Sequence, residues 1–265
     1  MAKRVYLSPS DQRRNTYAVG NTTEDVQCGR IAAACKAALE RSGVEVMVGQ
    51  YDTMANRVAA SNRFKADLHV PIHTNAANGK ATGTHIFCYD ADRNSAGYKA
   101  CRAVLGVLGP VTPGSPDVVR AYPALYEVKY PAAPTVYIEV DFHDVPSVAQ
   151  WIIANATVIG ETIAKGLCAA LGVEFVPGEN TPEPVPVQVE TVAMQVRVLR
   201  RGMTGADVKT LQAALIAYGY SCGAVGADGD FGAGTEAALK KFQTAYKLGA
   251  DGIAGKGTWG KLLGV

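Results

Sequence analysis

The sequence lacks the features that mark several common classes of protein. It contains no Lys/Arg-rich run, and its formal net charge is only +2 over 265 residues, so a nucleic-acid-binding surface is not indicated. No stretch approaches the roughly 20 consecutive apolar residues of a membrane helix. The first eight residues also lack the apolar core of a signal peptide. We therefore expect a chain that is synthesised in the cytoplasm and binds neither a membrane nor a nucleic acid.

Local metal-binding and disulfide patterns are also absent. The six cysteines form no CxxC pair, and no HExxH pattern occurs. In a chain of this size, scattered cysteines are more typical of core packing than of a disulfide framework or a zinc knuckle. What the sequence does have is apolar residues, which make up 48% of it against 19% charged residues. This composition predicts two folded domains.

Strand and helix patterns alternate along the first two thirds of the chain. The predicted strands are residues 4–7, 44–48, 66–75, 83–89 and 134–143. Helical periodicity follows at 23–42, 54–65, 95–108 and 146–167. Strands that alternate with helices of this length predict an α/β fold with a mostly parallel sheet flanked by helices on both faces.

The composition changes after residue 175. Residues 1–175 are predicted to form the α/β domain, and residues 176–197, which are rich in Pro and Glu, a linker. Residues 198–265 carry amphipathic helices separated by an internal repeat of Asp-Gly turns at 227–232 and 250–255. We expect a small all-helical C-terminal domain.

Three polar residues occupy positions typical of a metal site. His73 lies at the end of a predicted strand, Glu24 at the start of a helix, and Glu139 within an apolar strand, where an unpaired carboxylate would be costly. Imidazole and carboxylate ligands can hold zinc, and Glu139 could act as a general base on a bound water. The alternative interpretation is that His69, His73 and His85 are ordinary strand histidines and that Glu24 complements a helix dipole.

The order of these motifs resembles that of the zinc-dependent N-acetylmuramoyl-L-alanine amidases of the amidase 3 family. The matching blocks are residues 20–24, Arg57 with Asn62, 66–76 and 134–139. They cover residues 4–172, while residues 198–265 resemble the type 1 peptidoglycan-binding domain. The resemblance implies hydrolysis of the amide between N-acetylmuramic acid and L-alanine of the stem peptide, with Zn²⁺ as cofactor and peptidoglycan as partner. It makes Glu24 and His73 zinc ligands and Glu139 the catalytic residue.

The third zinc ligand of the family is where this sequence departs from the pattern. The family has a histidine in a Pro-Gly-His setting, whereas residues 9–12 read Pro-Ser-Asp-Gln. His143 is the preferred substitute, because period-two alternation places it on the strand face of Glu139. Asp11 is a second candidate, and a weak or water-completed site is a third.

Several functions remain open at this stage. A catalytic domain joined to a wall-binding domain without a signal peptide is typical of a phage or prophage endolysin, and an autolysin exported by another route is the alternative. A non-catalytic wall-binding protein on a degenerate amidase scaffold is a different class. A zinc peptidase that cuts within the stem peptide is a further one. No particular oligomeric state is predicted.

Overall fold

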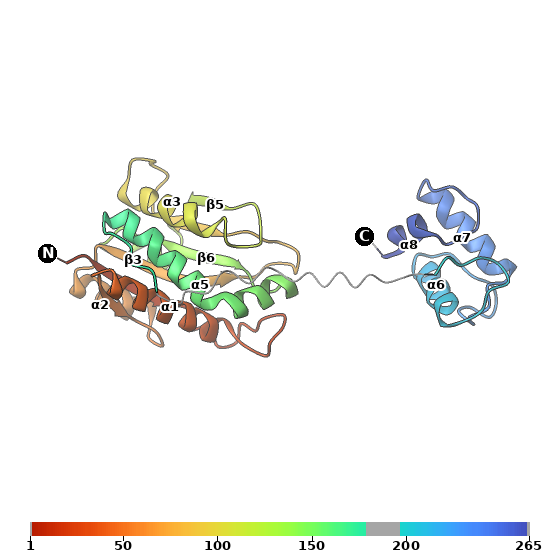
Figure 1. The fold of residues 1–265 in the computed structure, drawn as a ribbon, viewed down its shortest axis with the longest axis horizontal. Coiled ribbons are helices and arrows are strands. Elements are labelled where there is room, and N and C mark those ends of the chain that lie inside the picture. Colours follow the sequence, from red (N-terminus) through yellow and green to blue (C-terminus); the bar gives the residue numbers. More distant parts are fainter. Residues whose placement is uncertain (1, 179–196, 264–265) are drawn as a thin grey trace. The chain divides into compact units, whose positions relative to one another are not determined.

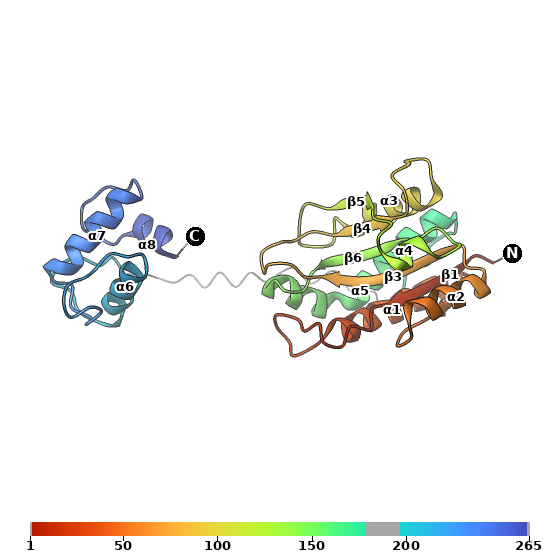
Figure 2. The same ribbon diagram turned by 180° about the vertical axis from the view of Figure 1, so that it is seen from behind.

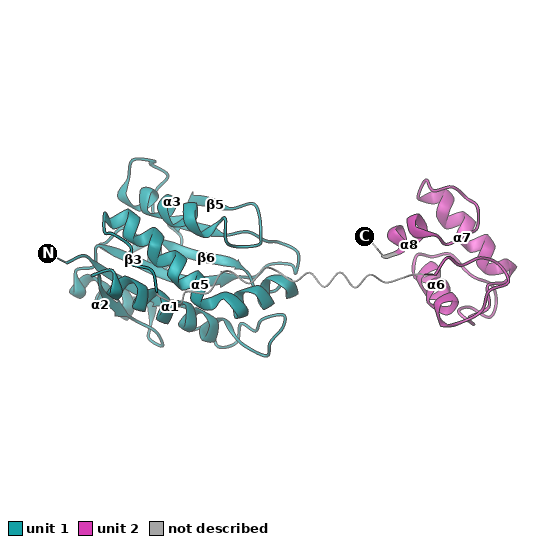
Figure 3. Cartoon of the chain, viewed as in Figure 1, with its two compact units in different colours: residues 1–189 teal, residues 190–265 magenta. Residues whose placement is uncertain are grey.

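The chain forms two compact units, residues 1–189 and 190–265 (Figure 3). The structure, a computed structural model, describes residues 2–178 and 197–263. The predicted linker, residues 176–197, therefore lies almost entirely outside the described residues. Each unit is treated by itself below.

Unit 1 is built on a six-stranded sheet with the order β2-β1-β3-β6-β4-β5. The strands are β1 Arg4–Pro9, β2 Glu45–Val48, β3 Leu68–Asn75, β4 His85–Cys88, β5 Val118–Ala121 and β6 Tyr137–Phe142. Every neighbouring pair is parallel except β4 with β6, which is antiparallel. The predicted mostly parallel sheet is confirmed.

Helices cover the two faces of this sheet unequally. Three long helices, α1 Glu24–Arg41, α3 Ala96–Leu108 and α5 Pro146–Leu171, pack on one face (Figure 1). Of the described helices, only α2 Met54–Phe64 and the short α4 Tyr126–Lys129 lie on the other face (Figure 2). The apolar residues of β1, β3 and β6 point toward the three long helices and form the core. The polar residues of the same strands therefore point to the thinly covered face.

Helix α5 corrects the expectation that no stretch of the chain approaches the apolar length of a membrane helix. Among the described residues it is the one helix long and apolar enough to cross a membrane by length and composition. Its most apolar window is 61% buried inside the fold, where α5 packs between α1 and α3. The apolar length of this helix is thus used in the core of unit 1.

Residues 109–133, which lie between the predicted helix at 95–108 and the predicted strand at 134–143, contain two short elements. They are β5 and α4, of four residues each. Elements this short show no periodicity that could predict them. They nevertheless contribute Arg120 and Glu127 to the thinly covered face of the sheet.

Unit 2 contains three helices, α6 Ala206–Ala217, α7 Ala233–Ala245 and α8 Lys256–Leu263. Its internal repeat is a repeated hydrogen-bond pattern around two buried glutamines, Gln212 and Gln243. Gln212 Oε1 accepts from the backbone N–H of Gly229 and Gln243 Oε1 from that of Gly252, at 2.8 and 3.0 Å. Their Nε2 groups donate to equivalent oxygens of Asp228, Asp230 and Thr235 and of Asp251, Ile253 and Thr258. Each glutamine thus joins an Asp-Gly turn to the helix that follows it.

Candidate active site

Glu24 and His73 are brought together from two elements of unit 1. Glu24 is the first residue of α1, and His73 lies near the end of β3. His73 Nδ1 is 2.8 Å from Glu24 Oε1, and both side chains are buried. The other carboxylate oxygen of Glu24 accepts a hydrogen bond of 2.7 Å from the Asn15 amide. Both oxygens of Glu24 are therefore engaged by fixed partners.

This contact favours the charged forms of both groups. Burial raises the pKa of Glu24, but hydrogen bonds from His73 and Asn15 outweigh it and hold that pKa below its ordinary value. Burial lowers the pKa of His73, but the hydrogen bond to Glu24 and the negative charge of Glu139 bring it above its ordinary value. The contact therefore stabilises the imidazolium form of His73 and the carboxylate form of Glu24.

Glu139 lies on β6 directly opposite His73 in the parallel register. The ring of its neighbour Tyr137 stacks on the His73 ring, with 4.8 Å between centroids. Glu139 Oε2 is buried and has no hydrogen-bond partner among the residues that the structure describes. Burial raises the pKa of Glu139 to about 7, although the positive charge of His73 opposes this change. A carboxyl group that titrates near neutral pH is suited to accept a proton from water and to release it again.

A cavity of about 580 Å³ adjoins this carboxyl group. Its lining residues are Asn75, Phe87, Arg120, Ala121, Tyr122, Leu125 and Glu139. The Phe87 ring forms one wall and packs against Tyr137 at 6.0 Å and Tyr122 at 5.4 Å between centroids. The cavity therefore offers an aromatic wall beside a proton acceptor.

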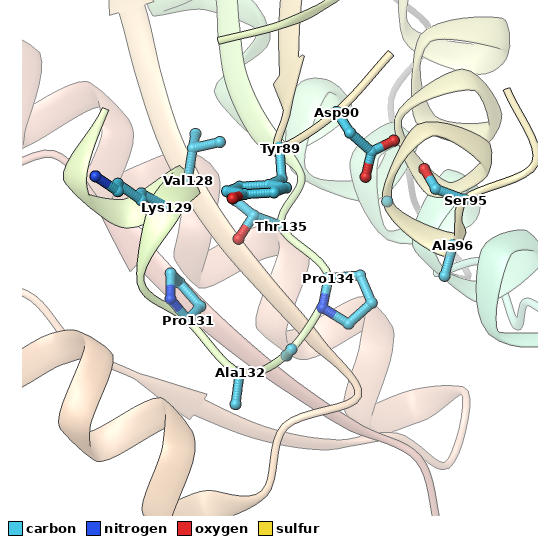
Figure 4. Close-up of a pocket in the computed structure, with 12 residues that line it drawn as sticks. Tyr89, Asp90, Ser95, Ala96, Val128, Lys129, Pro131, Ala132, Pro134 and Thr135 are labelled. Atoms are coloured by element: carbon cyan, nitrogen blue, oxygen red, sulfur yellow. The ribbon is translucent and has the colours of Figure 1, made fainter. Parts of the chain in front are cut away.

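A second cavity, of about 390 Å³, lies at the amino end of β6 (Figure 4). Asp90 and Lys129 are the two charged residues among those that line it, with Tyr89 and Pro134 on its walls. It contains none of the predicted site residues and lies at the opposite end of β6 from His143. The chemistry predicted from the sequence therefore belongs to the cavity at Glu139.

His143 leaves β6 on the face opposite to the one expected, although the charge of Glu24 still acts on it and opposes the lowering of the His143 pKa by burial. A β-bulge adds one residue to β6, because His73 pairs with Glu139 while Asn75 pairs with Phe142. One extra residue exchanges the faces of all residues that follow it. Phe142 therefore shares the face of Glu139, and His143 points to the other face. There its Nδ1 lies 2.9 Å from Thr74 Oγ1.

Asp11 is engaged in a buried polar network centred on Glu127. The guanidinium of Arg57 lies 2.5 Å from Asp11 and 3.8 Å from Glu127, and its Nη1 donates to the carbonyl of Pro9. Glu127 Oε1 also accepts from Ser8 at 2.5 Å and lies 3.2 Å from His69 Nε2. This Glu127 network ties α4 to β1, to β3 and to the loop after β1. Asp11 thus serves as a partner of Arg57.

The loop after β1 presents polar side chains beside Glu24. Asn15 Nδ2 lies 2.7 Å from Glu24 and donates a hydrogen bond of 3.0 Å to Gln12. Within residues 2–178 and 197–263, no three His, Cys, Asp or Glu side chains form a metal-binding group. A carboxylate and an imidazole are donor types that zinc accepts, and Glu24 and His73 supply one of each, in contact with one another at 2.8 Å. The unpaired oxygen of Glu139 faces the same side of the sheet.

The residues that sequence reasoning missed are Asn15, Tyr137, Arg120 and Glu127. Arg120 and Glu127 belong to the two four-residue elements that show no periodicity. Period-two alternation places Tyr137 on the face of Glu139, but its stacking on His73 depends on the pairing of β3 with β6. Such pairings join segments far apart in the chain, which local patterns do not reveal.

A carboxyl group that titrates near neutral pH, next to an imidazole–carboxylate pair and a cavity, is typical of a hydrolytic enzyme. The family described as N-acetylmuramoyl-L-alanine amidase matches residues 8–169, and the chain belongs to this family. Residues 204–262 match a peptidoglycan binding domain. The two resemblances predicted from the sequence are confirmed.

Relatives with curated sequences match shorter parts of the chain. The spore cortex-lytic enzyme of Oceanobacillus iheyensis is 36% identical over 97 residues, which cover 37% of this chain and 32% of that protein. The zinc D-Ala-D-Ala carboxypeptidase of Streptomyces albus G is 42% identical over 64 residues, covering 24% and 25%. The chain spans between 10% and 32% of the length of the first curated relatives it matches.

A solved structure shares the fold of unit 1. The catalytic domain of CwlV, an N-acetylmuramoyl-L-alanine amidase from Bacillus (Paenibacillus) polymyxa var. colistinus, superposes with a TM-score of 0.57 at 17% identity. The match covers 65% of this chain and 99% of that domain. The sheet and its helices are thus those of an amidase catalytic domain.

Proposed function

We propose that this chain hydrolyses the amide bond between N-acetylmuramic acid and L-alanine of the peptidoglycan stem peptide. The observation that carries the proposal is the buried, unpaired oxygen of Glu139 in a cavity of about 580 Å³, opposite the His73–Glu24 pair. Membership of the amidase family supports it. An unpaired buried carboxyl group destabilises a fold, and in a protein without catalytic activity nothing would compensate for this loss of stability.

Glu139 is the proposed general base and acid. With a pKa near 7, its carboxylate accepts a proton from the attacking water, and its carboxylic acid then donates that proton to the leaving amine. The amine of L-alanine leaves protonated, and the lactyl group gains a carboxylate. The aromatic wall formed by Phe87 and Tyr122 excludes water from one side of the cavity.

Glu24 and His73 are the proposed ligands of a zinc ion. Zinc bound there would supply a Lewis acid and lower the pKa of a bound water. Asn15 holds the Glu24 carboxylate through a hydrogen bond of 2.7 Å. Neither His143 nor Asp11 belongs to the ligand set we propose, since His143 leaves β6 on the face opposite to Glu139 and contacts Thr74, while Asp11 forms an ion pair with Arg57.

Residues 198–265 are proposed to hold the wall polymer, with residues 1–175 as the catalytic domain and 176–197 as the linker. The match of residues 204–262 to a peptidoglycan binding domain supports this division. Binding by one domain raises the effective concentration of substrate at the other. We propose that the chain acts on the cell wall, as an endolysin or an exported autolysin does.

Digestion of purified peptidoglycan by the full chain tests the activity. The expected products are new N-terminal alanine amines and muramic acid with a free lactyl carboxylate, identified by mass spectrometry. Glu139→Gln, which keeps the shape of the side chain, should slow release by about 10²-fold or more. Cleavage within the peptide would favour the peptidase alternative. Sedimentation with the wall without any product would favour the wall-binding alternative.

A further inference from the structure

The cavity beside Glu139 carries one positive and one negative side chain. Arg120 is the one cation and Glu139 the one anion among the residues that line it. The Arg120 side chain is exposed, and its guanidinium lies 5.1 Å from the centre of the Phe87 ring. Among the described residues no carboxylate pairs with this guanidinium. A cation held on a ring without an anionic partner can bind an anion from outside the chain.

The register of the sheet sets how far Arg120 lies from the reacting group. Glu139 on β6 pairs with His85 on β4, and Arg120 on β5 pairs with Phe87, two residues further along β4. Two strand spacings and two residue steps separate the Cα atoms of Glu139 and Arg120 by about 12 Å. Both side chains line the same cavity, so the gap between their polar ends is shorter. That gap suits an anionic group of the substrate that lies one or two residues away from the amide bond cleaved at Glu139.

We propose that Arg120 binds a carboxylate of the stem peptide, on the peptide side of the amide that is cleaved. This inference rests on the proposed function. Tyr122, which is 47% exposed, lines the same cavity and packs against the Phe87 ring, so it offers an aromatic surface for the peptide. Arg120 is thus a specificity residue that selects acidic stem peptides.

The chemistry of the guanidinium makes this selection specific. A guanidinium donates two parallel hydrogen bonds to a carboxylate, whereas a carboxamide offers one neutral oxygen. The Phe87 ring under Arg120 limits the motion of the side chain and so reduces the entropy lost on binding. A substrate with its carboxylate converted to a carboxamide should therefore bind about tenfold more weakly or worse.

Binding can be measured without turnover in the Glu139→Gln chain. The probes are an N-acetylmuramoyl dipeptide of L-alanine and glutamate with a free carboxylate, and the same compound with that group as a carboxamide. Isothermal titration calorimetry should give about tenfold tighter binding of the acid. Adding Arg120→Gln should remove this preference. Adding Arg93→Gln, at an exposed arginine outside the cavity, is the matched control and should leave it intact.

Three results would overturn the inference. They are equal affinity of the Glu139→Gln chain for both probes, an unchanged preference after Arg120→Gln, and equal losses from the Arg120 and Arg93 substitutions. Lack of binding to either probe counts against it as well. Cleavage of peptidoglycan by the wild-type chain decides the proposed function separately, because a wild-type chain that cleaves both probes equally retains the function and lacks the subsite.

Discussion

Replacing Glu139 by Gln should remove a pH dependence from the stability of unit 1. The ordinary pKa of a glutamate is 4.5, whereas that of Glu139 in the folded chain is about 7 because of burial. The folded chain therefore holds a proton that the unfolded chain releases between these values, and the free energy of unfolding falls as the pH rises from 4.5 to 7. At about 1.4 kcal/mol per pKa unit, this interval gives an upper value of about 3.5 kcal/mol. Because the Glu139 residue is partly exposed, solvent screening makes the actual change in the free energy of unfolding smaller than this value.

The two tryptophans make this measurement specific to unit 1. Trp151 lies in α5 and Trp259 in α8, so Trp259→Phe leaves Trp151 as the fluorescent reporter of unit 1. Urea unfolding with a chelator, from pH 4.5 to 8, gives the free energy of unfolding with and without Glu139→Gln. The stability gained by the variant should grow with pH and level off above pH 7. A difference that stays constant over this range would refute a raised pKa at Glu139.

Three further outcomes follow from the same structure. Glu127→Ala leaves Asp11 as the ion-pair partner of Arg57 but removes the acceptor of the buried Ser8 and His69 side chains, so it should lower the free energy of unfolding of unit 1 by about 1–3 kcal/mol for each of these two groups; a loss below about 1 kcal/mol in the Trp151 assay would contradict this. Gln243→Leu should destabilise unit 2 by about 1–3 kcal/mol for each buried group left without a partner, as followed by Trp259 fluorescence. His73→Ala should abolish binding of one zinc equivalent by the full chain, while His143→Ala should leave it unchanged; atomic absorption after gel filtration distinguishes the two.

The parts of the site that the sequence predicts are those marked by local position. Glu24 begins a helix with clear periodicity, and His73 ends a strand whose apolar residues alternate, so both could be placed before the structure. Their contact could not, since it joins α1 to β3 across the intervening β2 and α2. The alternation within β6 likewise placed Glu139 and Tyr137 on one face, as the structure does.

His143 shows where alternation fails. The rule that places it beside Glu139 holds only while the strand is regular, and the bulge after Glu139 shifts the register by one residue. Nothing in the apolar pattern of residues 134–143 reveals that shift. Arg120 and Glu127 were missed for another reason, because their elements are too short for a pattern and are held in place by contacts with distant strands.

The Glu127 network has a consequence for attempts to change substrate preference. Glu127 lies in the helix that follows Leu125, a wall residue of the cavity, and its hydrogen bond to Ser8 anchors the strand that leads into the loop of Asn15. The Glu127 carboxylate is therefore connected both to the cavity wall at Leu125 and to the loop whose Asn15 holds Glu24. An engineer who reshapes the wall through α4 will also move the groups that hold Glu24. Selectivity is better altered from β5, which does not carry this anchor.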